Sequence, residues 1–144
     1  MLAAILAALS FSAVSCGPKL TTGPGVVDPD APTEFTTTES GLKYRILRKG
    51  KGDYPTASSQ VVVDYAGTLE DGTTFDTSYN HSEPATFGLR SVVPGWTEGM
   101  QLVREGGMIE LQIPPDLAYG EEGSPPIIPP NATLMFRVEL LDIL

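Results

Sequence analysis

The sequence predicts an α+β domain in which an antiparallel sheet of about five strands wraps around one short α-helix. Three observations support this prediction. Segments of alternating apolar and polar residues recur from residue 39 to the end of the chain, as in half-buried strands. An Asp-Gly pair at 71–72 is a strong hairpin signal between two of them. One segment, beginning at Trp96, has helical spacing, so that helix must cover the apolar face of the sheet.

The strands follow from the alternation of apolar residues. In the segment 60–69, Val61, Val63 and Tyr65 share one face, and this segment runs into the Asp-Gly hairpin. In the final segment, every second residue from Leu134 to Leu140 is apolar. The predicted strands are 42–47, 60–69, 74–76, 108–113 and 133–144.

The helix follows from a different period. Trp96, Met100 and Val103 lie at positions i, i+4 and i+7, which places them on one helical face. The segment begins after Pro94 and is stopped by two glycines at 106–107, which are typical start and stop signals.

Composition excludes several classes of function. The 144 residues include 18 Asp plus Glu but only 9 Lys plus Arg, a net charge of −9. This balance argues against nucleic acid as a partner, because such binding depends on basic side chains. One Cys and one His allow neither an internal disulfide nor the usual Cys/His zinc site. We therefore expect no metal and no cofactor.

The first sixteen residues form a predicted export signal. No charged side chain occurs from Met1 to Ser15, and the apolar run is shorter than the about 20 residues that span a bilayer. The run ends in Ala13-Val14-Ser15-Cys16, which resembles a bacterial lipoprotein signal. We expect Cys16 to be lipidated and the protein to be exported, anchored only by its lipid and facing the periplasm or the cell exterior. The alternatives are a plain secretory signal with an incidental cysteine, or a short buried helix.

A flexible linker is predicted next, over residues 17–38. Pro, Gly, Thr and Asp prevail there and no apolar period is present. Phe35 is the residue of this stretch that could dock on the domain. The domain itself is then 39–144, and we expect a monomer, because a long N-terminal dimerisation helix is absent.

Five motifs of the domain occur in a specific order with short gaps. They are D-Y-A-G-T-L-E-D-G-T-T-F-D-T-S at 64–78, P-A-T-F at 84–87, V-V-P-G-W-T-E-G-M at 92–100, I-P-P-D-L-A-Y-G at 113–120 and I-I-P-P-N-A-T-L-M-F-R-V-E-L-L-D-I at 127–143. This set resembles the FKBP-type peptidyl-prolyl cis-trans isomerases over essentially all of 39–144. The chain is closest in style to the bacterial exported members.

The resemblance implies the same fold and a pocket that receives proline. Trp96 would be the floor of this pocket, and Asp76 and Tyr119 would supply the polar contacts of catalysis. The backbone N–H of Val93 would hold a substrate carbonyl. The walls and the overhanging loop would be Tyr65, Phe75, Phe87, Val92, Val93, Phe136, Ile127 and Ile128. The implied partners are unfolded or partly folded proline-containing polypeptides among exported proteins, and macrolide-type FKBP inhibitors.

Isomerisation of an X-Pro bond needs neither a nucleophile nor a metal, since no bond is broken. The barrier of roughly 18–20 kcal/mol comes from amide resonance, and a dry aromatic pocket favours the twisted amide. The alternative is an exported chaperone-like binding module with little turnover. Ala85 and Ser124 stand where many relatives have Phe and His, which leaves room for it. A third hypothesis is a structural lipoprotein with a degenerate fold, which would bind no proline-like ligand.

Overall fold

The computed structural model describes residues 25–144, so the predicted signal peptide and Cys16 lie outside the described residues. Within this range seven strands form one sheet in the order β1-β2-β6-β7-β3-β4, and β5 also pairs with β3. Every pairing is antiparallel. The strands are β1 (Thr36–Thr37), β2 (Lys43–Arg48), β3 (Gln60–Leu69), β4 (Thr74–Thr77), β5 (Ala85–Gly88), β6 (Met108–Ile113) and β7 (Leu134–Ile143).

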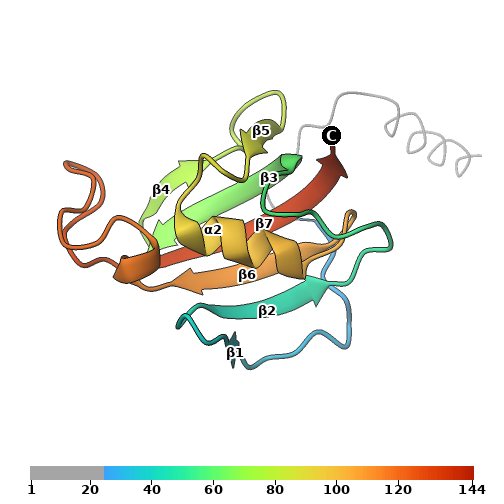
Figure 1. The fold of residues 1–144 in the computed structure, drawn as a ribbon, viewed down its shortest axis with the longest axis horizontal. Helices are drawn as coiled ribbons and strands as arrows, with labels where there is room; N and C mark the ends of the chain where they lie inside the picture. The colour runs from blue at the N-terminus through green and yellow to red at the C-terminus, as the bar shows by residue number, and fades with distance from the viewer. Residues whose placement is uncertain (1–24) are drawn as a thin grey trace, which may run out of the picture.

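The helix lies across one face of this sheet (Figure 1), which confirms the predicted α+β fold. β1 and β5 are additional to the five predicted strands, and they have two and four residues. Segments this short show no readable alternation. β3 is central because it pairs with β7 along its whole length, while β4 and β5 share its other edge.

Helix α2 (Pro94–Gly99) continues into a 3₁₀ turn, η1 (Met100–Leu102). Pro94 suits the first helical position because its φ is already fixed and its missing N–H is not needed there. A Cβ on Gly95 would lie 2.5 Å from the side chain of Ile113, and one on Gly99 would lie 2.6 Å from that of Leu111. These two glycines therefore let α2 lie directly on β6.

Among residues 25–144, no helix is long and apolar enough to cross a membrane.

The core lies between α2 and the sheet. The inward-facing residues of the long strands are fully buried there, together with Met100 of η1 and Leu89 after β5. The strand residues are Val61, Val63, Ile109, Leu111, Ile113, Leu134, Val138 and Leu140. Trp96, Tyr65 and Phe136 belong to the same cluster but also line a cavity, so the core and the candidate site are continuous.

The N-terminal strap, which we define as residues 26–35, is bound to the domain. Two arginines of β2 donate to carbonyls of the strap: Arg48 Nη1 to Val26 at 2.9 Å and Arg45 Nη1 to Thr33 at 3.1 Å. In the other direction, the backbone N–H of Asp28 donates to the carbonyl of Leu47 at 2.7 Å. Arg45 also lies 5.0 Å from the ring centroid of Phe35. The described part of the predicted linker 17–38 is thus docked rather than detached. Apolar periodicity gives no sign of this, because the contacts are mostly to backbone carbonyls.

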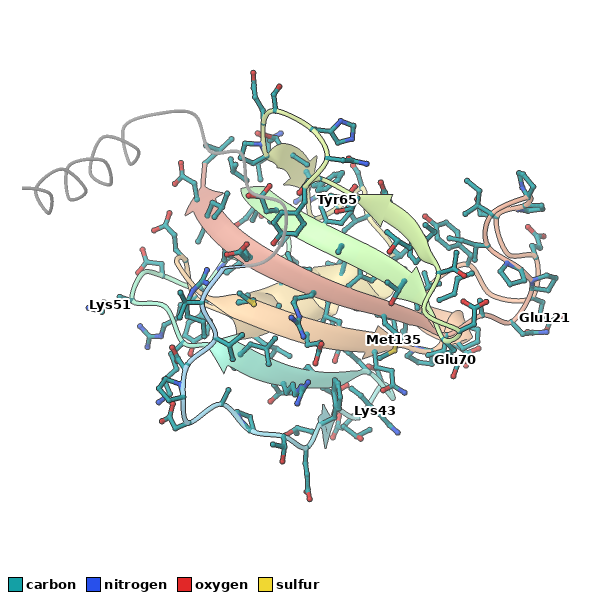
Figure 2. The ribbon with its side chains drawn as sticks, turned by 180° about the vertical axis from the view of Figure 1, so that it is seen from behind. Lys43, Lys51, Tyr65, Glu70, Glu121 and Met135 are labelled. Atoms are coloured by element: carbon teal, nitrogen blue, oxygen red, sulfur yellow. The ribbon has the colours of Figure 1, made fainter. Side chains whose placement is uncertain are left out.

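Figure 2 shows the molecule from the side of the sheet opposite α2. Polar side chains of neighbouring segments pair on this face. Tyr79, just after β4, donates a 2.5 Å hydrogen bond to Glu139 of β7, and Arg48 of β2 approaches the same carboxylate at 3.0 Å. Burial raises the pKa of the Tyr79 phenol, and the Glu139 carboxylate raises it further. Tyr79 therefore stays a neutral donor at physiological pH.

Candidate functional site

A cavity of about 420 Å³ opens beside the N-terminal end of α2. Eight of the predicted site residues line it: Tyr65, Asp76, Phe87, Val92, Val93, Trp96, Tyr119 and Phe136. Ser91 and Ala118 also line it and were not predicted. Each lies directly beside a predicted residue in the chain, so adjacency was the signal that could have found them.

Trp96 is held by three aromatic rings that stand nearly perpendicular to it. Its ring centroid lies 5.6 Å from Tyr65 at 89°, 5.5 Å from Phe87 at 78°, and 5.4 Å from Phe136 at 89°. Edge-to-face contacts of this kind are favourable, and Trp96 is only 4% exposed. The indole is thus a fixed apolar surface in the cavity.

Phe75 lies behind this wall rather than in the cavity lining. Its ring meets that of Phe136 at 5.5 Å and 88°. A Cβ on Gly67 would lie 2.7 Å from both rings, so only glycine at this β3 position lets the two phenylalanines meet. Phe75 therefore positions the Phe136 wall, while Phe136 itself faces the cavity.

Tyr65 and Asp76 form the polar side of the cavity. The Tyr65 hydroxyl donates a 2.7 Å hydrogen bond to Asp76 Oδ2. Burial raises the pKa of this phenol, and its hydrogen bond to the Asp76 carboxylate raises it further. The phenol therefore remains protonated, and Asp76 is held at the cavity by a neutral donor.

A buried polar bridge fixes the two strands that carry this pair. Ser78 Oγ accepts a 2.8 Å bond from the backbone N–H of Tyr65 and donates a 2.9 Å bond to Asp64. Asp64 is 6% exposed. Sequence reasoning missed both residues, because a serine after a strand and an aspartate within one give no pattern until the register is known.

The loop from 118 to 131 borders the cavity through Tyr119, which is 44% exposed. Two backbone hydrogen bonds between Ser124 and Ile128 close its tip, and Asn131 N–H bonds the carbonyl of Gly120. Ile128 is 5% exposed and belongs to the core, whereas Ile127 is 57% exposed. Neither isoleucine lines the cavity. The loop brings Tyr119 to the rim and anchors itself through Ile128.

Val93, which lines the cavity, has a backbone N–H without a partner in the described part of the chain. Val93 is the residue before α2, with φ −60° and ψ 150°. Its carbonyl accepts from Trp96 and Thr97, but its N–H has no acceptor within residues 25–144. The arrangement combines a flat apolar floor, aromatic walls, a phenol–carboxylate pair and the free N–H of Val93. It suits an apolar ring that carries a neighbouring carbonyl.

Comparison with known proteins identifies the family. The family model for FKBP-type peptidyl-prolyl cis-trans isomerases matches residues 52–141. The chain belongs to the FKBP family. The FKBP domain is 54% identical over 107 residues to the FKBP-type peptidyl-prolyl cis-trans isomerase FkpA of Escherichia coli K12, covering 74% of this chain and 39% of the relative. It is 45% identical over 107 residues to the peptidyl-prolyl cis-trans isomerase Mip of Coxiella burnetii, covering 74% and 46%.

Solved structures show the same FKBP fold. The crystal structure of FkpA from Escherichia coli has a TM-score of 0.74 and 52% identity, covering 78% of this chain and 52% of that chain. The crystal structure of AtFKBP13 has a TM-score of 0.71 and 33% identity, covering 77% and 99%. The chain spans less than half the length of the two curated relatives. The chain therefore shares both its fold and its family with these proteins.

Proposed function

We propose that the FKBP domain catalyses cis–trans isomerisation of X-Pro bonds in polypeptides. The observation that carries this proposal is the perpendicular aromatic enclosure of Trp96. A proline ring is compact and apolar, so it would rest on the indole while its amide lies toward Asp76 and Val93. The family membership of the chain supports the same activity.

The cavity would lower the barrier by changing the surroundings of the amide. Resonance makes the planar amide polar and opposes rotation by roughly 18–20 kcal/mol. The twisted amide is less polar, so removal of water disfavours the planar state more than the twisted one. Each 1.4 kcal/mol taken from the barrier is about tenfold in rate.

Three polar groups would orient the substrate carbonyls while the bond rotates. The free N–H of Val93 would hold one carbonyl, and Tyr119 would reach the other from the rim. Asp76, fixed by Tyr65 at 2.7 Å, would place its negative charge near the carbonyl carbon, which loses electron donation from the nitrogen as the amide twists. None of these groups has to transfer a proton.

A protease-free isomerisation assay on a panel of X-Pro peptides tests this function. Asp76→Asn and Tyr119→Phe keep shape and change only polarity, so kcat/KM is expected to fall several-fold, about the value of one hydrogen bond of 0.5–1.5 kcal/mol. The matched controls are Asp53→Asn and Tyr54→Phe, both exposed and outside the cavity lining, which should have no effect. Complete loss of turnover in a folded variant would instead indicate obligatory proton chemistry. No effect of either variant would place the site elsewhere.

A chaperone-like binding module is the second candidate. Tyr119 at the cavity rim and Ile127 on the same loop are large exposed side chains, and such surface suits unfolded chains. Trp96 is the one tryptophan of the chain, so its fluorescence reports binding directly. An isomerase should lose affinity when the test peptide's proline is replaced by leucine, whereas a chaperone-like module should retain it.

We also propose that the protein is an exported lipoprotein anchored through Cys16, with a monomeric domain that acts on exported proline-containing polypeptides and accepts macrolide-type inhibitors. The uncharged apolar run that ends in Ala13-Val14-Ser15-Cys16 supports the anchor. Mass spectrometry of the mature protein should find a lipidated Cys16 at its N-terminus. Cleavage at another position, or a Cys16→Ser form that stays equally membrane-bound, would contradict the anchor.

A further inference from the structure

A second and larger hollow lies along α2. This helix groove, about 760 Å³ in volume, runs between the turn at 56–58 and the exposed side of α2. Val92 lines both the helix groove and the aromatic cavity. The two hollows therefore meet at Val92, one residue from the free N–H of Val93.

Most polar groups of the helix groove are already used within the chain. Thr97 Oγ1 donates to the carbonyl of Leu89 at 2.5 Å, and Gln101 Nε2 donates to the carbonyl of Thr97 at 2.8 Å. The carboxylate of Glu98 accepts a 2.5 Å bond from Ser40. These groups shape the walls and leave little polarity to recognise a ligand.

Arg90 is the exception. It lines the helix groove and is exposed. The other arginines of residues 25–144 make ion pairs or bind backbone carbonyls, but no hydrogen bond or ion pair is recorded for Arg90 within that range. Arg90 is also the single Lys or Arg within 52–103, and 105–136 contains none. The groove therefore carries the one cation of the chain segments that build the site.

The position of Arg90 relates it to a bound client. It precedes Val92 by two residues, a span of at most about 7 Å in an extended chain. A polypeptide with its proline in the cavity and its next residues across Val92 would pass this guanidinium within about four residues. The only charged groups lining the groove are Arg90 and Glu98. Glu98 keeps its negative charge while it accepts from Ser40, so Arg90 is the group of the groove that attracts a client carboxylate.

We infer that the helix groove is an extended subsite for the client polypeptide, in which Arg90 selects an acidic residue near the proline. This inference rests on the proposed isomerase function, since it places the client's proline in the aromatic cavity. Arginine recognises carboxylates through paired N–H donors. Because the chain as a whole carries −9, an acidic residue elsewhere in the client should weaken binding. An acidic residue should therefore favour binding only at a particular distance from the proline.

The test is a set of alanine-rich peptides with one proline and one Glu or Gln, placed in turn at about four positions on each side of the proline. The measurement is kcat/KM by exchange NMR. On one side of the proline, Glu should raise kcat/KM about two- to fivefold over Gln, the effect of an exposed ion pair, and high salt should remove the gain. Arg90→Gln should abolish this preference, and Arg90→Glu should reverse it so that Gln exceeds Glu. The matched control Lys51→Gln, exposed and outside both hollows, should leave it intact.

Two results would overturn the subsite: Glu lowering kcat/KM at every position, or the Glu preference persisting in Arg90→Gln. A short X-Pro peptide that contains neither Glu nor Gln separates the isomerase proposal from the subsite proposal, since wild type and Arg90→Gln should isomerise it equally. If that peptide is not isomerised, the isomerase proposal fails. The Glu and Gln peptides are then compared by titration of Trp96 fluorescence, where equal affinities reject the subsite and a preference that needs Arg90 supports it.

Discussion

Tyr65 donates a 2.7 Å hydrogen bond to Asp76 while the ring of the same tyrosine stands at 89° to that of Trp96. One side chain of β3 thus supports both the apolar floor of the cavity and its carboxylate. Tyr79, a few residues after Asp76, makes a similar bond to Glu139 on the opposite face of the sheet. Residues 25–144 therefore contain two phenol–carboxylate pairs, one in the site and one outside it.

The first prediction compares these two pairs. Tyr65→Phe removes the donor to Asp76 but keeps the ring, so kcat/KM for an X-Pro peptide should fall about two- to tenfold, as one hydrogen bond of 0.5–1.5 kcal/mol implies. Tyr79→Phe should lower the free energy of unfolding by about 1.5–3 kcal/mol, the value of a hydrogen bond to a charged group, and leave kcat/KM unchanged. Equal loss of kcat/KM in both variants would mean that the effect is general destabilisation rather than orientation of Asp76.

The second prediction concerns alkaline pH. Burial and then a carboxylate hydrogen bond raise the pKa of both Tyr65 and Tyr79 above the ordinary value of 10.0. The fold therefore favours neutral phenols, and their contribution to stability is complete below pH 10 and is lost as pH rises further toward the folded-state pKa values. Urea denaturation measured from neutral to strongly alkaline pH should show the free energy of unfolding decline above about pH 10.

The double variant Tyr65→Phe/Tyr79→Phe is the control for this decline. It should start from a lower stability at neutral pH and lose less as pH rises. An equally steep decline in the double variant would assign the alkaline loss to other groups.

Much of the fold could be predicted because its long elements carry a clear period. The segment 60–69 and the segment 108–113 were predicted with the bounds that β3 and β6 have. The helix was predicted from Trp96 to Val103, but α2 tightens into a 3₁₀ turn at Met100, and Val103 is extended. Periodicity marks the buried face of a helix, whereas its end depends on local hydrogen bonds.

The parts that escaped prediction depend on contacts between distant segments. The N-terminal strap has no apolar period, since arginines of β2 hold its carbonyls. The bridge between Ser78 and Asp64 exists only when β4 pairs with β3. Ile127 and Ile128 are adjacent and chemically identical, yet one is exposed and one is in the core, which only the path of the loop decides.

The third prediction tests the strap. From composition alone, trimming the chain to about residue 39 should cost nothing. The contacts of residues 26–35 instead imply that a chain beginning at residue 36 has a free energy of unfolding lower by about 1–4 kcal/mol, the sum of a few partly exposed hydrogen bonds. A chain beginning at residue 25 is the control and should denature like the full chain. Its kcat/KM should match that of the shorter chain at low temperature, because none of the strap residues lines the cavity.

Identical denaturation midpoints for the two trimmed chains would show that the strap contacts contribute nothing in solution. A loss of kcat/KM without loss of stability would show instead that the strap acts on the site.

The fourth prediction is the effect of a single methyl group on the packing of α2. Gly95→Ala replaces a poor helix former with the best one, so helix propensity alone predicts a gain of about 1 kcal/mol. The new Cβ would, however, lie 2.5 Å from Cγ2 of Ile113, and overpacking of this kind costs about 1–3 kcal/mol. The sign of the change in stability therefore shows whether helix propensity or overpacking dominates. We expect overpacking to dominate and the urea midpoint of unfolding to fall. Because Trp96 follows directly, a displaced helix should also shift its fluorescence and lower kcat/KM. Gly88→Ala is the matched control: nothing lies within 4 Å of its Cβ position, and it should change neither quantity. A stabilised Gly95→Ala with normal kcat/KM would show that α2 can move off β6 at no cost, and that the floor of the site does not depend on their close approach.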